Sequence, residues 1–184
     1  MSSGHQAKLK DRGPAVTFIV GLAGSGKSTL LNSLVYDVVF EECFWLNDDA
    51  LERNHKELLT FLGQNKHCVI TERRFMHREA RDVYTRQLRE DVPLLQINWF
   101  FFEKNLEAAN HNCRSRTNKE GDLHGVRHIE QNEGDFDNYT IPDGAVAIKI
   151  HRWPGLAPSE AANYLQSMGP EPSEPETEHS LSKN

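Results

Sequence analysis

The sequence is poor in cysteine and lacks a long apolar run. Its 184 residues include three cysteines, Cys43, Cys68 and Cys113, with no C-x-x-C pair, which indicates a reducing, cytoplasmic setting. Cys43 and Cys68 fall in strand-like stretches, where we expect them to pack as small hydrophobic side chains. The longest strongly apolar stretch, at 99–102, is far too short to span a membrane. The polar N-terminus lacks the apolar segment of a signal peptide.

Basic charge is also scarce. Lysine and arginine number 21 against 27 acidic residues, which gives a net charge of −6. Because sequence-independent binding of nucleic acid depends on broad basic surfaces, this balance does not favour it. A nucleic-acid substrate would therefore have to be held by a local basic patch.

Apolar strand-like runs alternate with helical stretches along most of the chain. We expect a flexible leader at 1–13, one domain at 14–168 and a disordered acidic tail at 169–184, which is rich in Pro, Glu and Ser. The strands expected are 16–20, 43–46, 68–71, 94–102 and 146–150, and the helices expected are 27–39, 50–62, a stretch within 77–90, 106–113 and 160–167. This alternation predicts an α/β fold with a doubly wound parallel sheet.

The junction between the first expected strand and helix carries a phosphate-binding motif. The pattern is G-x-x-x-x-G-K-[ST], formed by Gly21, Leu22, Ala23, Gly24, Ser25, Gly26, Lys27, Ser28 and Thr29. Glycines let the backbone curl so that several N–H groups point at one anion, and the helix N-terminus adds its positive end. Lys27 would reach the β- and γ-phosphates, and the Ser28 hydroxyl would hold Mg²⁺. The motif predicts a nucleoside triphosphate as ligand, with ATP and Mg²⁺ expected, and a three-layer αβα fold of the P-loop NTPase and nucleotide-kinase type.

Carboxylates follow two of the expected strands. Asp48 and Asp49 come directly after the second, at the edge of the sheet where ligands bind in such folds. Phosphoryl transfer to an alcohol requires a carboxylate to accept or orient the hydroxyl proton, and either residue could do so. Capping of the next helix is the alternative role. Glu72, after the third strand, is a candidate Mg²⁺ ligand, with ordinary surface charge as the alternative.

Arginines gather in two further segments. Arg114 and Arg116 begin a stretch at 113–128 that we expect to be a mobile lid, in which an arginine would neutralise charge on the transferring phosphoryl group. A solvated basic loop is the alternative. The second segment, at 73–89, carries six arginines among acidic residues. Ion pairing along a helix face explains much of this pattern, and binding of acceptor phosphates remains an alternative for the first three.

Taken together, these motifs resemble the small P-loop kinases around the 5′-kinase domain of phage polynucleotide kinase, and the related phage kinases that act on 5-hydroxymethyluracil in DNA. The resemblance rests on the P-loop, on Asn47-Asp48-Asp49 and on the arginines after Asn112. It implies that Lys27 and Ser28 bind phosphates and Mg²⁺, that Asp48 or Asp49 is the general base, and that Arg114 or Arg116 stabilises the transition state. Glu72 stands where the family tends to have Asp.

The predicted function is therefore ATP-dependent transfer of the γ-phosphate to a hydroxyl group on DNA or a nucleotide. The acceptor would be a 5′-hydroxyl end or the hydroxymethyl group of a modified base. A kinase of small metabolites or nucleosides is the alternative that the acidic composition favours. An NTP-driven switch is a further alternative, but the chain lacks a guanine-reading motif in the required place.

Overall fold

The structure is a computed structural model of the chain. It describes residues 13–41, 48–120 and 124–152. The chain divides into two units, 1–152 and 153–184, and only the first contains described residues. Its strands are β1 (Ala15–Val20), β2 (Val38–Glu41), β3 (His67–Thr71), β4 (Gln96–Phe102) and β5 (Val146–Ile148). Its helices are α1 (Lys27–Leu31), α2 (Asp48–Gly63), the 3₁₀ helix η1 (Arg73–Met76), α3 (Arg78–Asp91), α4 (Leu106–Glu120) and α5 (His124–Phe136).

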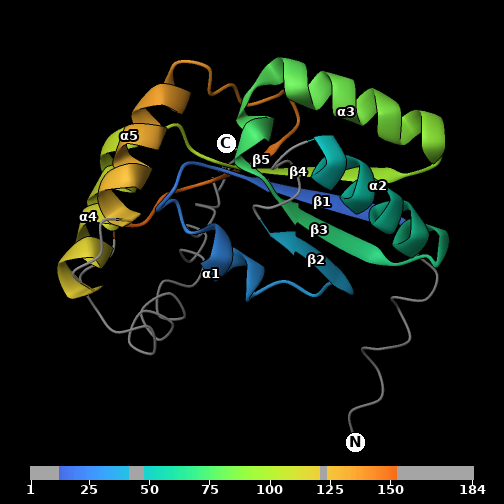
Figure 1. Ribbon diagram of the computed structural model, residues 1–184, viewed down its shortest axis with the longest axis horizontal. Helices are drawn as coiled ribbons and strands as arrows, with labels where there is room; N and C mark the ends of the chain where they lie inside the picture. The colour runs from blue at the N-terminus through green and yellow to red at the C-terminus, as the bar shows by residue number, and fades with distance from the viewer. Residues whose placement is uncertain (1–12, 42–47, 121–123, 153–184) are drawn as a thin grey trace, which may run out of the picture. The chain divides into compact units, whose positions relative to one another are not determined.

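The five strands form one parallel sheet in the order β2-β3-β1-β4-β5. The central strand β1 pairs with β3 on one side, where Ile19 lies opposite Thr71, and with β4 on the other, where Val20 lies opposite Phe101. Helices flank the sheet, so the predicted α/β three-layer class is confirmed (Figure 1). Because β1 is central, the loop that follows it emerges in the middle of the carboxyl edge of the sheet.

An aromatic cluster attaches α3 to the sheet. Phe18 of β1 stacks on Trp99 of β4 with ring centroids 4.2 Å apart, and it meets Phe75 edge-on at 4.9 Å and Tyr84 at 6.2 Å. Helix α3 buries Arg81, Tyr84 and Leu88, which share one helix face because they are three and four residues apart. This packing fixes the segment after β3 against the strand that carries the P-loop.

The second strand and the first helix differ from the sequence prediction. The strand was expected at 43–46, whereas β2 is Val38–Glu41 and residues 42–47 lie outside the described part of the chain. The helix was expected to run to residue 39 but ends at Leu31. Ser33 Oγ there donates to the carbonyl of Leu30 at 2.7 Å, a side-chain bond that competes with helix continuation.

The segment expected as a lid loop is largely helical. Residues 113–120 belong to α4 and residues 124–128 to α5, a helix that the sequence analysis did not predict. Figure 1 shows α4 and α5 side by side at the end of the sheet where β1 leads into α1. We refer to these two helices as the α4–α5 pair. The leader to residue 12, the helix expected at 160–167 and the tail lie outside the described residues.

Buried polar side chains hold the connections between these elements. The guanidinium of Arg81 donates to the carbonyls of Phe75 and Met76 at 2.7 and 2.9 Å and to Thr140 Oγ1 at 2.9 Å. Cys68 is fully buried in the sheet, as predicted, and burial raises the pKa of its thiol to about 12. Among the described helices, none is long and apolar enough to cross a membrane.

Candidate functional site

The P-loop leaves β1 at Val20 and requires glycine at two positions. Gly24 and Gly26 have φ angles of +78° and +108°, in the left-handed region that side-chain-bearing residues rarely adopt. The first turn of α1 follows at Lys27, and the N–H groups of a first helical turn have no partner within the helix. The predicted strand–loop–helix arrangement of the motif is therefore confirmed.

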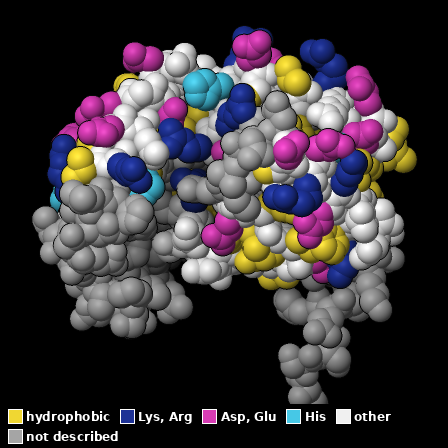
Figure 2. All heavy atoms as spheres, viewed as in Figure 1, with side chains coloured by type: hydrophobic (Ala, Val, Ile, Leu, Met, Phe, Trp, Pro, Cys, Tyr) yellow, Lys and Arg dark blue, Asp and Glu magenta, His cyan; other side chains and the backbone are white. Residues whose placement is uncertain are grey.

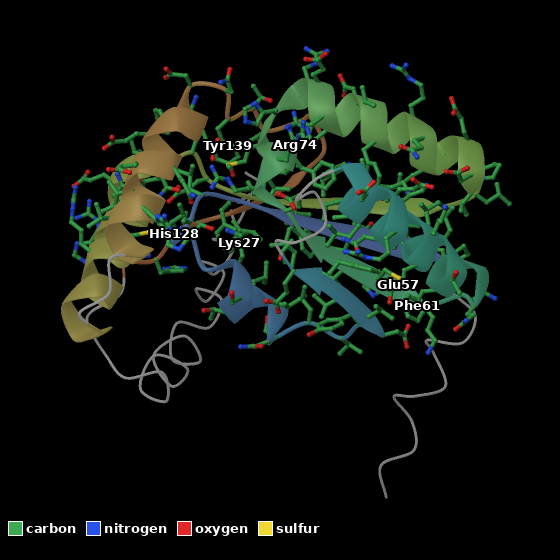
Figure 3. All side chains as sticks on the ribbon, viewed as in Figure 1. Lys27, Glu57, Phe61, Arg74, His128 and Tyr139 are labelled. Atoms are coloured by element: carbon green, nitrogen blue, oxygen red, sulfur yellow. The ribbon has the colours of Figure 1, made fainter. Side chains whose placement is uncertain are left out.

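The ammonium of Lys27 lies inside this loop. Lys27 is only 8% exposed. Its Nζ donates to the carbonyl oxygens of Gly21 at 3.0 Å and Leu22 at 3.2 Å. Figure 3 shows Lys27 at the end of the sheet beside which α4 and α5 lie. The loop thus carries a buried positive charge, which suits the binding of an anionic group.

Ser25 adds an unsatisfied polar group to the same loop. Ser25 is 3% exposed, and its Oγ is a buried oxygen that has no hydrogen-bond partner among the described residues. Buried hydroxyls in native proteins are normally bonded, so an unpaired hydroxyl at this position fits a loop that binds a polar ligand. The donors and the charge of the loop fit a phosphate group.

Helix α4 packs directly on the P-loop. A Cβ built on Gly24 would lie 2.4 Å from the carbonyl oxygen of Ala109 and 2.9 Å from Cys113 Sγ. Real Cβ atoms essentially never approach other atoms so closely. The loop and α4 are therefore in contact at a point where only glycine fits.

Two asparagines of the α4–α5 pair bind the P-loop backbone. Asn132 of α5 accepts from the N–H of Ala23 at 2.8 Å and donates to the carbonyl of the same residue at 3.0 Å. Asn112 of α4 donates to the carbonyl of Gly24 at 2.8 Å. The role of Asn132 was not predicted from the sequence. A polar residue on the inner face of an amphipathic stretch was the signal that could have indicated it.

The two predicted magnesium ligands lie at the same edge of the sheet. Ser28 is exposed in the first turn of α1. Glu72 directly follows Thr71, a residue of β3 that pairs with β1. Glu72 is 5% exposed, and its carboxylate accepts a hydrogen bond from the N–H of Arg74 at 3.2 Å. No group of three His, Cys, Asp or Glu side chains among the described residues could hold a metal ion. Magnesium in kinase sites does not require one, since it takes few protein oxygens and keeps several waters and phosphate oxygens.

The other predicted catalytic residues are only partly described. Asp48 and Asp49 begin α2, where Asp49 is exposed and the side chain of Asp48 lies outside the described part. Arg114 is exposed on α4, one residue after Cys113, which packs against the P-loop. The side chain of Arg116, further along α4, is not described either. The roles of these four residues stay predictions.

The arginines after β3 have diverse environments. Arg73 is paired with Asp135 of α5 at 2.5 Å, so this ion pair joins η1 to the α4–α5 pair. Arg81 is buried among backbone carbonyls and serves the fold. Figure 2 shows dark-blue Lys and Arg side chains around the hollow between the α4–α5 pair and the helices above the sheet. Local positive charge is thus present at this edge despite the acidic composition.

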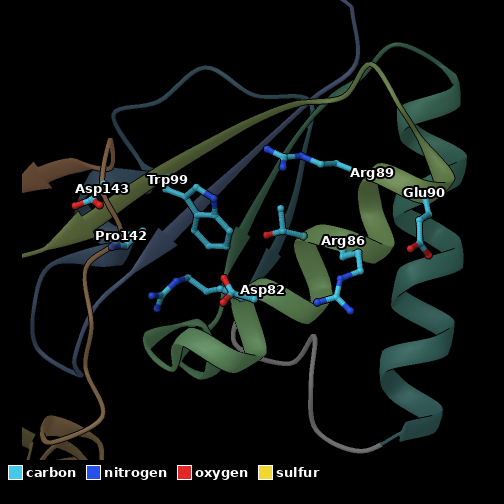
Figure 4. A pocket seen from close by; sticks show the side chains of 9 residues that line it. Asp82, Arg86, Arg89, Glu90, Trp99, Pro142 and Asp143 are labelled. Carbon is cyan, nitrogen blue, oxygen red and sulfur yellow. The ribbon is translucent and has the colours of Figure 1, made fainter.

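A separate cavity lies on the flank of α3 and β4. It has a volume of about 600 Å³ (Figure 4), and none of its lining residues belongs to the P-loop, η1 or the α4–α5 pair. It is lined by Arg81, Asp82, Thr85, Arg86, Arg89, Glu90, Trp99, Pro142 and Asp143. Positive and negative side chains are equal in number there, so the cavity offers no clear preference for an anion.

Comparison with solved structures finds distant likenesses, including the following. A chain of the Pnkp1/Rnl/Hen1 RNA repair complex is similar to this chain at a TM-score of 0.44 and 17% sequence identity, over 71% of this chain and 49% of that one. This chain therefore spans about half the length of that chain. No family model and no curated protein matches the sequence. Any conclusion about function must therefore come from the site itself.

Proposed function

We propose that this protein is a P-loop kinase that transfers the γ-phosphate of ATP to a hydroxyl group, with DNA or a nucleotide as the favoured acceptor. The observation that carries the proposal is the buried ammonium of Lys27, held within 3.2 Å of two loop carbonyls where β1 turns into α1. Such a loop supplies a fixed charge and backbone donors for phosphate oxygens without reorganisation at the moment of transfer.

Each residue of the site has a defined task in this proposal. Lys27 binds the transferring phosphoryl group, and Ser28 and Glu72 hold Mg²⁺, which would neutralise charge on the phosphates when bound. Asp48 or Asp49 accepts the proton of the acceptor hydroxyl. Arg114 or Arg116 stabilises the charge of the transition state from α4.

A kinase of small metabolites or nucleosides is the second candidate. The net charge of −6 favours it, because a polyanionic acceptor is repelled by an acidic surface. The Lys and Arg side chains around the hollow in Figure 2 favour the nucleic-acid acceptor instead. The two candidates differ in the size of the acceptor and share the same chemistry.

The test is a transfer assay with γ-labelled ATP and Mg²⁺ against a panel of acceptors. The panel contains 5′-hydroxyl DNA and RNA, DNA with hydroxymethyl pyrimidines, free nucleosides and small alcohols. Label on the polymers is the expected result. Label on nucleosides or alcohols alone would move the proposal to the second candidate, and label only in inorganic phosphate would contradict a kinase altogether.

The aspartate pair gives a further prediction. If one of the two is the base, Asp48→Asn and Asp49→Asn are expected to differ in turnover by about a hundredfold or more, because amides do not accept the proton. Both variants are expected to bind ATP like the wild type, since neither residue belongs to the P-loop. Single-turnover transfer and an ATP titration measure the two quantities. Full activity in both variants would exclude the pair as the base.

A further inference from the structure

We propose that Asn132 and Asn112 are positioning residues through which the α4–α5 pair sets the shape of the P-loop and responds to the nucleotide bound there. The inference rests on the proposed function, in that the P-loop must bind a nucleotide. It assigns to the two asparagines a role that their residue types and spacing in the sequence did not indicate.

Asn132 makes two hydrogen bonds to the backbone of a single residue, Ala23. Its Oδ1 accepts from Ala23 N at 2.8 Å, while its Nδ2 donates to Ala23 O at 3.0 Å and to Asn110 Oδ1 at 2.9 Å. The residue is 2% exposed. Exchanging the amide oxygen and nitrogen would bring donor against donor at Ala23, so the orientation of the amide is fixed by its partners.

Asn112 binds the next residue of the loop from the other helix. Its Nδ2 donates to Gly24 O at 2.8 Å and to His151 O at 2.9 Å, and the residue is 1% exposed. Two consecutive P-loop residues, one of them in the left-handed conformation, are therefore held from α5 and α4. Asparagine is a weak helix former, so these positions are occupied against local preference.

The consequence is an energetic coupling between two parts of the site. The P-loop receives the phosphates, and α4 carries Arg114 one residue beyond its contact with Gly24. If the loop changes its shape or rigidity when it binds phosphate, the bonds from Asn112 and Asn132 transmit that change to the helix pair. By linkage, a helix pair that stabilises the bound form of the loop is stabilised in turn by the nucleotide.

The experiment is amide hydrogen exchange of the full chain with and without a non-hydrolysable ATP analogue and Mg²⁺. A binding titration measures the Kd of the analogue. In the wild type, the analogue is expected to slow exchange in α4 and α5 as well as in the P-loop. Asn132→Asp, which removes the donor to both Ala23 O and Asn110 Oδ1, is expected to weaken binding at least about tenfold, as the loss of buried hydrogen bonds implies. In this variant the added protection of α4 and α5 is expected to disappear.

Asn98→Asp, which likewise removes an amide donor, is the matched control. This asparagine of β4 donates to Thr17 Oγ1 at 3.3 Å, away from the P-loop, so its loss is expected to leave the Kd and the protection pattern unchanged. Equal Kd and equal protection in folded Asn132→Asp would overturn the inference. If that variant does not fold, the wild type alone decides, because protection limited to the P-loop overturns it too. A wild type that does not bind the analogue refutes the proposed function, which is a distinct outcome.

Discussion

Replacing Lys27 by methionine is expected to lower phosphoryl transfer by about a hundred- to a thousandfold, the effect of removing one preorganised group from a charge-stabilising site. Methionine keeps most of the apolar stem and loses the ammonium that lies 3.0 Å from the Gly21 carbonyl. The free energy of unfolding is expected to change by only about 1 kcal/mol, since the lost hydrogen bonds are offset by the relief of burying a charge. Single-turnover transfer and chemical denaturation measure the two effects.

Lys56→Met is the matched control for this experiment. Lys56 lies on α2 in an exposed i,i+4 ion pair with Glu52, which lowers the pKa of that carboxylate but contributes little to stability. Activity in this variant is expected to equal that of the wild type. If Lys27→Met retained more than half of the wild-type rate, the assignment of Lys27 to the transferring phosphoryl group would be wrong.

Gly24→Ala is expected to destabilise the protein by about 2–4 kcal/mol, because the new Cβ meets a carbonyl oxygen and the backbone has a positive φ. The clash is with Ala109 O at 2.4 Å. Either α4 or the loop must shift, so nucleotide affinity is expected to fall together with stability. The corresponding drop in Tm is about 5–15 °C for a chain of this size, and thermal unfolding with and without ATP measures it.

Gly134→Ala tests whether the effect at Gly24 comes from its site. Gly134 lies within α5, where a Cβ would meet nothing within 4 Å. Alanine there is expected to raise stability by about 0.5–1 kcal/mol through the reduced entropy of the unfolded chain. A similar loss of stability in both variants would show that the close contact between Gly24 and α4 is not the cause of the effect at Gly24.

The sequence predicted the parts of this molecule that depend on local patterns. The P-loop has a fixed spacing of glycines and lysine, and the apolar runs of β1, β3 and β4 are long enough to identify as strands. The strand β2 was not predicted at 38–41 because 36–46 contains two successive strand-like runs with no glycine or proline between them, and the second run, at 43–46, lies outside the described residues. Periodicity alone gave no basis for choosing between them.

The helical part beyond residue 113, which is the end of α4 and all of α5, was missed for a different reason. Its sequence is rich in Asn, Gly and charged residues, a composition typical of a loop. Asn112 and Asn132 bind the backbone of the P-loop, 88 and 109 positions away, and Asn132 also binds Asn110. Tertiary hydrogen bonds thus override local preference, and no window of sequence contains them.

The bonds from Asn132 to Ala23 also bear on the order of folding. They join residues 109 positions apart, and the ion pair of Arg73 with Asp135 joins residues 62 apart. Contacts between residues so distant along the chain require the closure of long loops, which costs conformational entropy. We expect them to form only after earlier contacts have brought the two segments closer together. The P-loop, although it lies near the N-terminus, is therefore expected to reach its final shape only after α5 has packed against it, late in the folding of the chain.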